Sequence, residues 1–423
     1  MKTLIKNGTV YIDGAFCARD ILIEDEIISQ VSDSIEAIAD VTVDASGKHI
    51  FPGFVDLHAH LRDPGQTYKE DIVTGTRAAA KGGFTTVCAM PNTEPVIDNI
   101  AAVEYIQRRA KDLGFCKVRV IGAITKQSEG KEISEMATMK SGGIIGVSDD
   151  GKCVQNARLM LNCMKYAVNY DLPVIIHAED YNLAGKGQIH AGRIASKTGL
   201  SGIPAIAEEV IIARDIMLAE STKARLHVAH VSTAKSLELI RDAQNRGIQV
   251  TCEVTPHHLL LNEEATQTFD PNTKMKPPLR SEQDRLALVE GLKSGLISCI
   301  ATDHAPHADY EKEREFDHAP FGIIGFETAF AVLYHHLVRA GLISLERLIE
   351  AMAIAPANIM KLYQPGIIEG NKADLVIADL DAKILVNVDT LLSKSKNTPW
   401  LNQVFMGKIV TTYCDGDVTW KAD

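Results

Sequence analysis

The spacing of hydrophobic positions changes after the first fifty residues. From Met1 to about Ile50, short runs rich in β-branched residues are separated by Asn-Gly, Asp-Gly and Ser-Gly pairs, as in TLIKNGTVYI, DILIEDEIISQVS and VTVDASGKHI. Runs of this length, bounded by turn residues, are typical of strands. We therefore predict a small antiparallel sheet at the start of the chain.

From Phe51 onward, apolar runs of strand length alternate with amphipathic segments of helix length, such as residues 99–113 and 281–293. Eight candidate strands occur: FVDLHAH, FTTVCAM, CKVRVIGAI, GGIIGVSDD, LPVIIHAE, ARLHVAHV, GIQVTCEVTPH and LISCIATDHA. No Gly-x-Gly-x-x-Gly follows the first of them, so the main cue for a dinucleotide site is missing. The pattern favours an α/β fold of the (β/α)8 TIM barrel type over an open doubly wound sheet.

Strand-like patterns return after about Pro365, in GIIEGNKADLVIADLD and KIVTTYCDGDVTW. The simplest arrangement joins the two ends of the chain in one small domain. We predict a β-sandwich domain built from residues 1–50 and 365–423, with the barrel, residues 51–364, inserted between them.

Composition narrows the classes of function. The chain has 423 residues and a net charge of -11, which offers no general attraction to nucleic acid or an anionic membrane. Eight scattered cysteines without a Cys-x-x-Cys pair indicate free thiols in a reducing compartment. The first residues do not resemble a signal peptide, and no apolar run is long enough to span a membrane. We expect a cytoplasmic protein, in which an anionic substrate would need a local basic group.

Two histidines on the first barrel strand provide the first sign of chemistry. Side chains alternate faces along a strand, so His58 and His60 point to the same side. A single buried histidine is usually a hydrogen-bonded core residue. A pair on one face, at the carboxyl end of a strand, favours metal binding, because two unpartnered imidazoles would be costly to bury.

Other predicted strands end in metal-ligand residues at the same face of the barrel, where such barrels carry their active sites. These residues are His177, His230, Asp303 and one of the adjacent pair Asp149 and Asp150, between which spacing alone does not choose. Together with the first two histidines they exceed the needs of one tetrahedral ion. No cysteine occupies these positions, as it would in most structural zinc sites. The pattern predicts a catalytic centre with two divalent ions.

The motifs that carry these residues resemble a known family. His-x-His on the first strand, single histidines on two later strands and an aspartate on the last are similar to the amidohydrolase superfamily. The longer phrases DLHAHLRDPG, MPNTEPVIDN, VIIHAED, ATDHAPH and APFGIIGFETAF resemble dihydroorotases of the bacterial class I form. The resemblance implies zinc-dependent, reversible cyclisation of N-carbamoyl-L-aspartate to L-dihydroorotate in de novo pyrimidine (UMP) biosynthesis.

The resemblance also implies a role for each ligand of two zinc ions. Many superfamily members bridge their metals with a carboxylated lysine, whereas this form uses an aspartate, which places Asp150 in that role. A hydroxide bridging the metals would be the nucleophile, and Asp303 would act as general base and acid. The implied ligands are His58, His60, Asp150 and Asp303 for one ion, and Asp150, His177 and His230 for the other.

Substrate contacts are expected around the metals. Arg62 lies two residues after His60, hence on the same face, and its guanidinium can bind a carboxylate with two hydrogen bonds. The resemblance adds further substrate contacts at His60, Asn92, Lys276, His307, Phe321 and Gly322. Lys276 departs from the family, which has asparagine in KMKPPLR, and lysine donates but cannot accept. The charged run YEKEREFDH is typical of a solvated loop, and its position also allows a mobile lid.

Two rival functions are compatible with the motifs. Another cyclic-amide hydrolase, of the allantoinase or dihydropyrimidinase type, would generally need the bridging lysine, and GIIGVSDD contains none. A non-catalytic scaffold homologue should have lost metal ligands, whereas all six are present. The resemblance further allows a homodimer and an association with aspartate transcarbamoylase.

Overall fold

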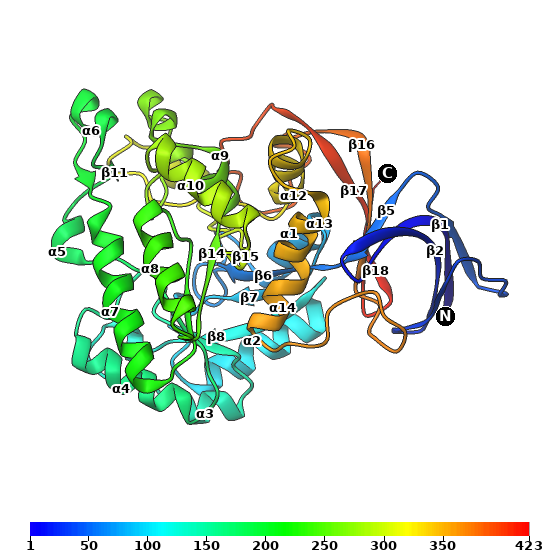
Figure 1. Ribbon diagram of the computed structural model, residues 1–423, viewed down its shortest axis with the longest axis horizontal. Coiled ribbons are helices and arrows are strands. Elements are labelled where there is room, and N and C mark those ends of the chain that lie inside the picture. The colour runs from blue at the N-terminus through cyan, green and yellow to red at the C-terminus, as the bar shows by residue number, and fades with distance from the viewer. Residues whose placement is uncertain (423) are drawn as a thin grey trace.

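The main body of the protein is a barrel of parallel strands surrounded by helices. The structure is a computed structural model that describes residues 1–422 (Figure 1). Neighbouring strands pair in parallel throughout, and Ala59 bridges His304 just beyond the last strand, so the sheet nearly closes on itself. The predicted (β/α)8 fold is confirmed. The strands are β6 (Phe54–Ala59), β7 (Phe84–Ala89), β8 (Lys117–Gly122), β9 (Gly146–Ser148), β10 (Val174–Ile176), β13 (Leu226–Val228), β14 (Val250–Val254) and β15 (Cys299–Ile300).

Helices connect successive strands of the barrel. The two helices predicted at residues 99–113 and 281–293 form, and each starts after a side-chain cap: Asn99 accepts from the Ala102 amide and Ser281 from the Asp284 amide. The principal helices are α1 (Ile72–Lys81), α2 (Ile100–Leu113), α3 (Met136–Ser141), α4 (Ala157–Val168), α7 (Ile206–Thr222), α8 (Ala234–Asn245), α10 (Glu282–Lys293), α12 (Ala329–Leu333), α13 (Leu345–Ile349) and α14 (Ala355–Ile359). Short elements decorate the loops: α5 (Tyr181–Ala184), β11 (Ile189–His190), α6 (Arg193–Thr198), β12 (Gly202–Ile203), α9 (Pro256–Leu260) and α11 (Asp309–Lys312).

A second sheet draws its strands from both ends of the chain, which lie at the same end of the molecule (Figure 1). Its strand order is β18-β17-β16-β5-β1-β2-β3, with β4 also paired to β1. The expectation of an antiparallel sheet at the N-terminus was wrong in part, because β1 pairs in parallel with both β4 and β5. The residue boundaries of the two domains stay a prediction. The strands are β1 (Lys2–Ile12), β2 (Ala15–Glu24), β3 (Ile27–Ser32), β4 (Val41–Asp44), β5 (His49–Pro52), β16 (Leu375–Leu385), β17 (Val404–Cys414) and β18 (Asp417–Lys421).

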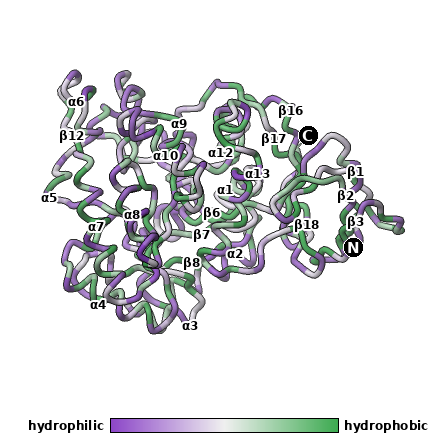
Figure 2. Tube along the Cα trace, in the orientation of Figure 1, coloured by the Kyte–Doolittle hydropathy of each residue, from purple (hydrophilic) through white to green (hydrophobic). Residues whose placement is uncertain are grey.

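An aromatic cluster fastens the second sheet to the barrel. Phe51 on β5 stacks on Phe54 at the start of β6, with ring centroids 5.4 Å apart, and both rings lie 5.5 Å from that of Phe330 on α12. Full burial of each ring contributes roughly 1.5–3 kcal/mol. The hydrophilic segments lie mainly at the periphery of the chain trace (Figure 2). The shared core holds the barrel strands rigidly, which fixes where their carboxyl ends point.

The described residues agree with two further expectations from composition. All eight cysteines are free thiols, and seven of them are buried. No helix within residues 1–422 is both long enough and apolar enough to cross a bilayer.

Candidate metal centre and substrate pocket

Four imidazoles and two carboxylates meet at the carboxyl ends of the barrel strands. The Oδ1 atom of Asp150, just after β9, lies 3.2 Å from His58 Nε2, 3.7 Å from His177 Nδ1 and 3.9 Å from His230 Nε2. His60 approaches the same carboxylate through Oδ2, at 3.5 Å. Asp150 is therefore the centre of the cluster, in contact with all four histidines.

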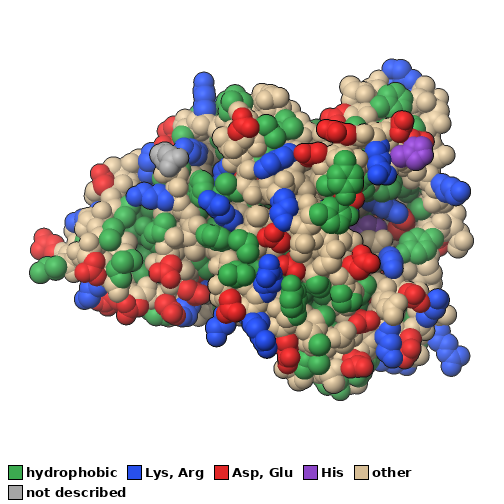
Figure 3. Space-filling model, turned by 180° about the vertical axis from the view of Figure 1, so that it is seen from behind, with side chains coloured by type: hydrophobic (Ala, Val, Ile, Leu, Met, Phe, Trp, Pro, Cys, Tyr) green, Lys and Arg blue, Asp and Glu red, His purple; other side chains and the backbone are tan. Residues whose placement is uncertain are grey.

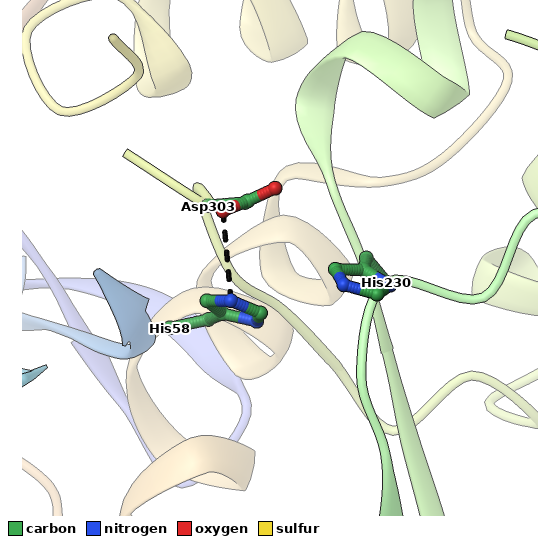
Figure 4. Close-up of side chains that lie close together, drawn as sticks. All are labelled: His58, His230 and Asp303. Carbon is green, nitrogen blue, oxygen red and sulfur yellow. Dashed lines mark ion pairs between the residues drawn. The ribbon is translucent and has the colours of Figure 1, made fainter. Parts of the chain in front are cut away.

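The second carboxylate approaches the cluster from the last strand. Asp303 Oδ1 lies 3.1 Å from His60 Nε2 and 3.5 Å from His58 Nε2 (Figure 4). The same figure shows His230 to the right of His58 and Asp303, on a different strand end. The two carboxylates thus approach the His58 ring from different loops of the barrel.

The donor atoms lie close enough together to hold metal. Three overlapping groups place one ligand atom per residue within 4.8 Å of one another: His58, His60 and Asp150; His58, His230 and Asp303; Asp150, His177 and His230. His58 Nε2, Asp150 Oδ1 and His230 Nδ1 are buried without a hydrogen-bond partner among the described residues. Nitrogen and carboxylate oxygen are the ligands that catalytic zinc sites use. The cluster therefore has the composition and the unsatisfied atoms that metal binding would require.

Burial and mutual charge set the protonation of the cluster. Burial alone raises the pKa of Asp150, but the histidines around it outweigh this and hold that pKa well below its usual range. Asp303 is held ionised by the same opposition between burial and the nearby histidines, which lower its pKa. Burial and the neighbouring imidazoles lower the pKa of His230 to about 3. The cluster thus offers ionised carboxylates and at least one neutral imidazole.

The backbone is strained where functional side chains emerge. Arg62, His230 and Asp303 have φ values of 58°, 32° and 48°, in the left-handed region that side chains other than glycine rarely adopt. Such conformations cost roughly 1–3 kcal/mol each and persist only where the surroundings enforce them. Here the strain accompanies the turns that bring these side chains back over the barrel.

The adjacent aspartates at the end of β9 have separate surroundings. Asp149 accepts hydrogen bonds from the amides of Ile124 and Thr125, at 2.8 and 3.0 Å, and from the Thr125 hydroxyl. Its carboxylate is occupied with holding the preceding loop and belongs to none of the three ligand groups. Asn92 instead faces the cluster, with its amide nitrogen 3.2 Å from Asp150 Oδ2 and its oxygen 2.8 Å from His60 Nδ1.

Glu253 on β14 supports the cluster from inside the barrel and was missed in the sequence. Its carboxylate lies 2.7 Å from His58 Nδ1 and 3.0 Å from His227 Nε2. Despite burial, these two imidazoles lower the pKa of Glu253 to about 2. Because the carboxylate can accept the Nδ1 proton, Nε2 of His58 is directed toward Asp150, where a bound metal would take its lone pair. The available signal was a single charge within the apolar run VTCEV.

A cavity of about 360 Å³ opens above the cluster. Figure 3 looks onto the face of the molecule opposite to that of Figure 1 and shows a hollow with basic and histidine side chains inside it. With the exception of His58, which is fully buried, every residue predicted to bind metal or substrate lines this cavity. They are His60, Arg62, Asn92, Asp150, His177, His230, Lys276, Asp303, His307, Phe321 and Gly322.

The two basic side chains of the cavity, Arg62 and Lys276, differ in the partners that they have within the protein. Arg62 is 8% exposed, and the only hydrogen bond of its side chain within residues 1–422 runs from Nε to the Pro306 carbonyl, at 3.2 Å. Lys276, in contrast, pairs with the buried Glu179 through a contact of 2.8 Å. The free edge of the Arg62 guanidinium is therefore available to an anion, while the charge of Lys276 is already balanced.

A larger cavity, of about 440 Å³, lies elsewhere, between the barrel and the second sheet. Its lining includes Lys117, which is paired with Asp374 and, at 2.9 Å, with Asp415. It contains no histidine and lies apart from the ligand cluster.

Comparison with known proteins gives a consistent result. The family described as "Dihydro-orotase-like" matches residues 47–236. Proteins named dihydroorotase from Thermoanaerobacter sp. (strain X514) and Bacillus cereus (strain B4264) are 48% and 46% identical to this chain. Each comparison covers all of this chain and 98% or 99% of the relative.

Solved structures show a similar architecture. An L-hydantoinase (dihydropyrimidinase) from Arthrobacter aurescens superposes with a TM-score of 0.90 at 27% identity, over 98% of this chain and 95% of its own. A dihydropyrimidinase from Brevibacillus agri NCHU1002, at 23% identity, shares the fold with a TM-score of 0.87, over 99% and 95% of the two chains. The full-length similarity to the relatives, together with the site, shows that the chain belongs to the dihydroorotase family.

Proposed function

We propose that this chain is a zinc-dependent cyclic amide hydrolase that interconverts N-carbamoyl-L-aspartate and L-dihydroorotate. One observation carries the proposal: an aspartate, Asp150, is central among four histidines, and the same cavity exposes the free edge of Arg62. The first feature suits a pair of metals bridged without lysine. The second suits a ring that bears a carboxylate.

The ligand groups support the proposal of two zinc ions at the cluster. One would be held by His58, His60, Asp150 and Asp303, and the other by Asp150, His177 and His230, with Asp150 shared. When bound, such ions supply a Lewis acid for the amide carbonyl and a water nucleophile whose pKa is lowered to about 7. Glu253 would keep the His58 ring oriented toward them.

The protein's own groups would bind the ring and move the proton. The guanidinium of Arg62 would bind the substrate carboxylate with two hydrogen bonds, supported by Asn92 and His307, which also line the cavity. Asp303 is ionised and faces the cavity, so it can accept a proton during ring opening and deliver it to the departing ring nitrogen. In ring closure the same carboxylate takes the proton from that nitrogen.

A panel of cyclic amides tests the proposal. Zinc-loaded protein is assayed with L-dihydroorotate, dihydrouracil, hydantoin and allantoin, and the metal content is measured on the same sample. We expect turnover of dihydroorotate only, with about two metals per chain. Turnover of an uncharged ring instead would overturn the substrate assignment, and metal-free, inactive protein would overturn the enzyme assignment. The homodimer and the association with aspartate transcarbamoylase stay predictions.

A further inference from the structure

Two buried lysines beside the substrate cavity are surrounded by backbone carbonyls. Lys274 is 1% exposed, and its ammonium donates to the carbonyls of Phe316, Asp317 and Ala319, at 2.7, 3.1 and 2.7 Å. Lys312 at the end of α11 is 7% exposed. Its ammonium donates to the carbonyls of Pro271, Pro320 and Gly322, at 2.8, 2.9 and 2.9 Å.

Each ammonium is fully satisfied by this arrangement, because a protonated lysine has three N–H donors. Neither lysine forms an ion pair with a carboxylate of residues 1–422, so the carbonyls alone replace the water that burial removes. Burial lowers the pKa of both amines, which reflects the cost of desolvating them. The Phe321 ring lies 4.7 Å from the Lys274 ammonium and adds a cation–π contact. The hydrogen bonds from the two ammonium groups to the carbonyls are charged, and charged hydrogen bonds are roughly twice as strong as neutral ones.

Five of the six carbonyls belong to one segment, residues 316–322. This segment ends in Phe321 and Gly322, which line the substrate cavity. Further contacts have the same effect: the Gly322 amide donates to the Lys274 carbonyl, at 2.9 Å, and His307 Nε2 donates to the Phe321 carbonyl, at 2.9 Å. Asn397 Nδ2 donates to the Gly322 carbonyl, at 3.2 Å. Among its side chains, the buried Phe316 ring packs with Ile189 and Ile194, and the Phe321 ring faces Lys274. Backbone groups make the hydrogen bonds that hold the segment.

We propose that Lys274 and Lys312 are positioning residues whose ammonium groups hold segment 316–322 in its substrate-binding geometry before substrate arrives. This wall of the pocket is thus preformed. The part of the charged run 310–318 that belongs to it, residues 316–318, does not move as a lid. The proposal rests on the proposed function only in assigning Phe321 and Gly322 to substrate. The preformed geometry itself can be measured without any substrate.

The first measurement uses the unmodified protein. Amide hydrogen exchange of the substrate-free holoenzyme is followed in peptides that cover residues 316–322 and, for reference, the buried strand β14. We expect the amides of Ala319 and Gly322, which donate to Glu315 and Lys274, to exchange within about tenfold of the reference. Exchange at the rate of an unprotected loop would overturn the proposal, whether or not any variant folds.

The second measurement compares Lys274→Met and Lys312→Met with Lys293→Met, which replaces an exposed lysine at the end of α10. Methionine keeps a similar unbranched stem and removes the charge. We expect faster exchange confined to residues 316–322, an increase in KM for L-dihydroorotate of about tenfold or more, and kcat and metal content within about twofold. The control should change none of these quantities.

The pattern of changes separates positioning from general stability. A lysine that only stabilised the fold would lower the thermal midpoint and accelerate exchange throughout the barrel, without a selective increase in KM. That result, or unchanged exchange and KM in both variants, would contradict the proposal. If the unmodified enzyme did not turn over dihydroorotate, the exchange data would still decide the positioning question, and only the substrate assignment would fail.

Discussion

The floor and the wall of the substrate cavity are built on opposite principles. The floor consists of the ligand cluster, in which imidazole and carboxylate side chains at strand ends contact one another. The wall consists of residues 316–322, in which backbone carbonyls are held by two lysines, Lys312 just before the segment and Lys274 from a separate loop. The floor therefore depends on the identity of each residue. The wall depends on two cations outside it and on its buried Phe316 ring, and it should tolerate side-chain changes at its exposed positions, Asp317 and His318.

Removal of metal should have the largest effect and should act on the floor alone. We expect dialysis against a zinc chelator to reduce turnover to background, since both the nucleophile and the Lewis acid are lost together. Addition of zinc should restore it. Hydrogen exchange of residues 316–322 should remain the same in the metal-free protein. Loosening of that segment on metal removal would show that floor and wall are not independent.

Replacement of the proton-transfer group should have the next largest effect. We expect Asp303→Asn to lower kcat by about 10²–10⁴-fold while KM changes little, because asparagine cannot accept and return the proton. The metal content of the assayed sample must be measured, since Asp303 also contacts His58 and His60. Asp389→Asn, at an exposed site, is the matched control. Nearly normal turnover in metal-loaded Asp303→Asn would remove this residue from the proton-transfer role.

Loss of the support beneath the floor should weaken metal binding. Glu253→Gln removes the charge that orients His58, and we expect the affinity for zinc to fall by about 10–100-fold. Competition with a metal indicator measures this directly. KM at saturating zinc should be unchanged. Glu263→Gln, which alters a buried carboxylate away from the cluster, should leave the affinity at its original value.

The smallest effect is expected at Lys276, whose ammonium lies 5.5 Å from the Phe321 ring. Lys276 is partly exposed and its charge is already balanced by Glu179, so Lys276→Asn should change KM by no more than about threefold, although it leaves the buried Glu179 carboxylate unpaired. Steady-state kinetics of Lys276→Asn are compared with those of the double variant Lys276→Asn/Glu179→Gln. A difference in KM between them would show that the unpaired Glu179 carboxylate affects substrate binding. A change of kcat would mean that Lys276 reaches the reacting atoms, contrary to the division between floor and wall.

The barrel and most of the floor could be predicted because they follow from local patterns. Alternating faces placed His58 and His60 together, and strand ends gave His177 and His230, since all such ends meet at one face of a barrel. Strand direction could not be predicted in the same way. The parallel pairing of β1 with β4 and β5 leaves no trace in the period of hydrophobic residues.

The supporting contacts could not be predicted because they join distant segments. Glu253 lies 195 residues from His58, and Asn397, whose oxygen accepts from the His307 amide, lies 90 residues from it. The groups that accept hydrogen bonds from Lys274 are backbone carbonyls. Every residue has one, so these contacts cannot be recognised from the sequence. The sequence therefore predicted the residues that would contact metal and substrate, but not the residues that hold those side chains in place.

The left-handed backbone at Arg62, His230 and Asp303 bears on how this protein can be altered in the laboratory. Three residues in strained conformations amount to several kcal/mol of stability that the native chain forgoes. Glycine or asparagine at these positions would relieve part of that strain. Directed evolution that selects for heat resistance alone would therefore drift toward well-folded, inactive proteins, and each round must also select for turnover.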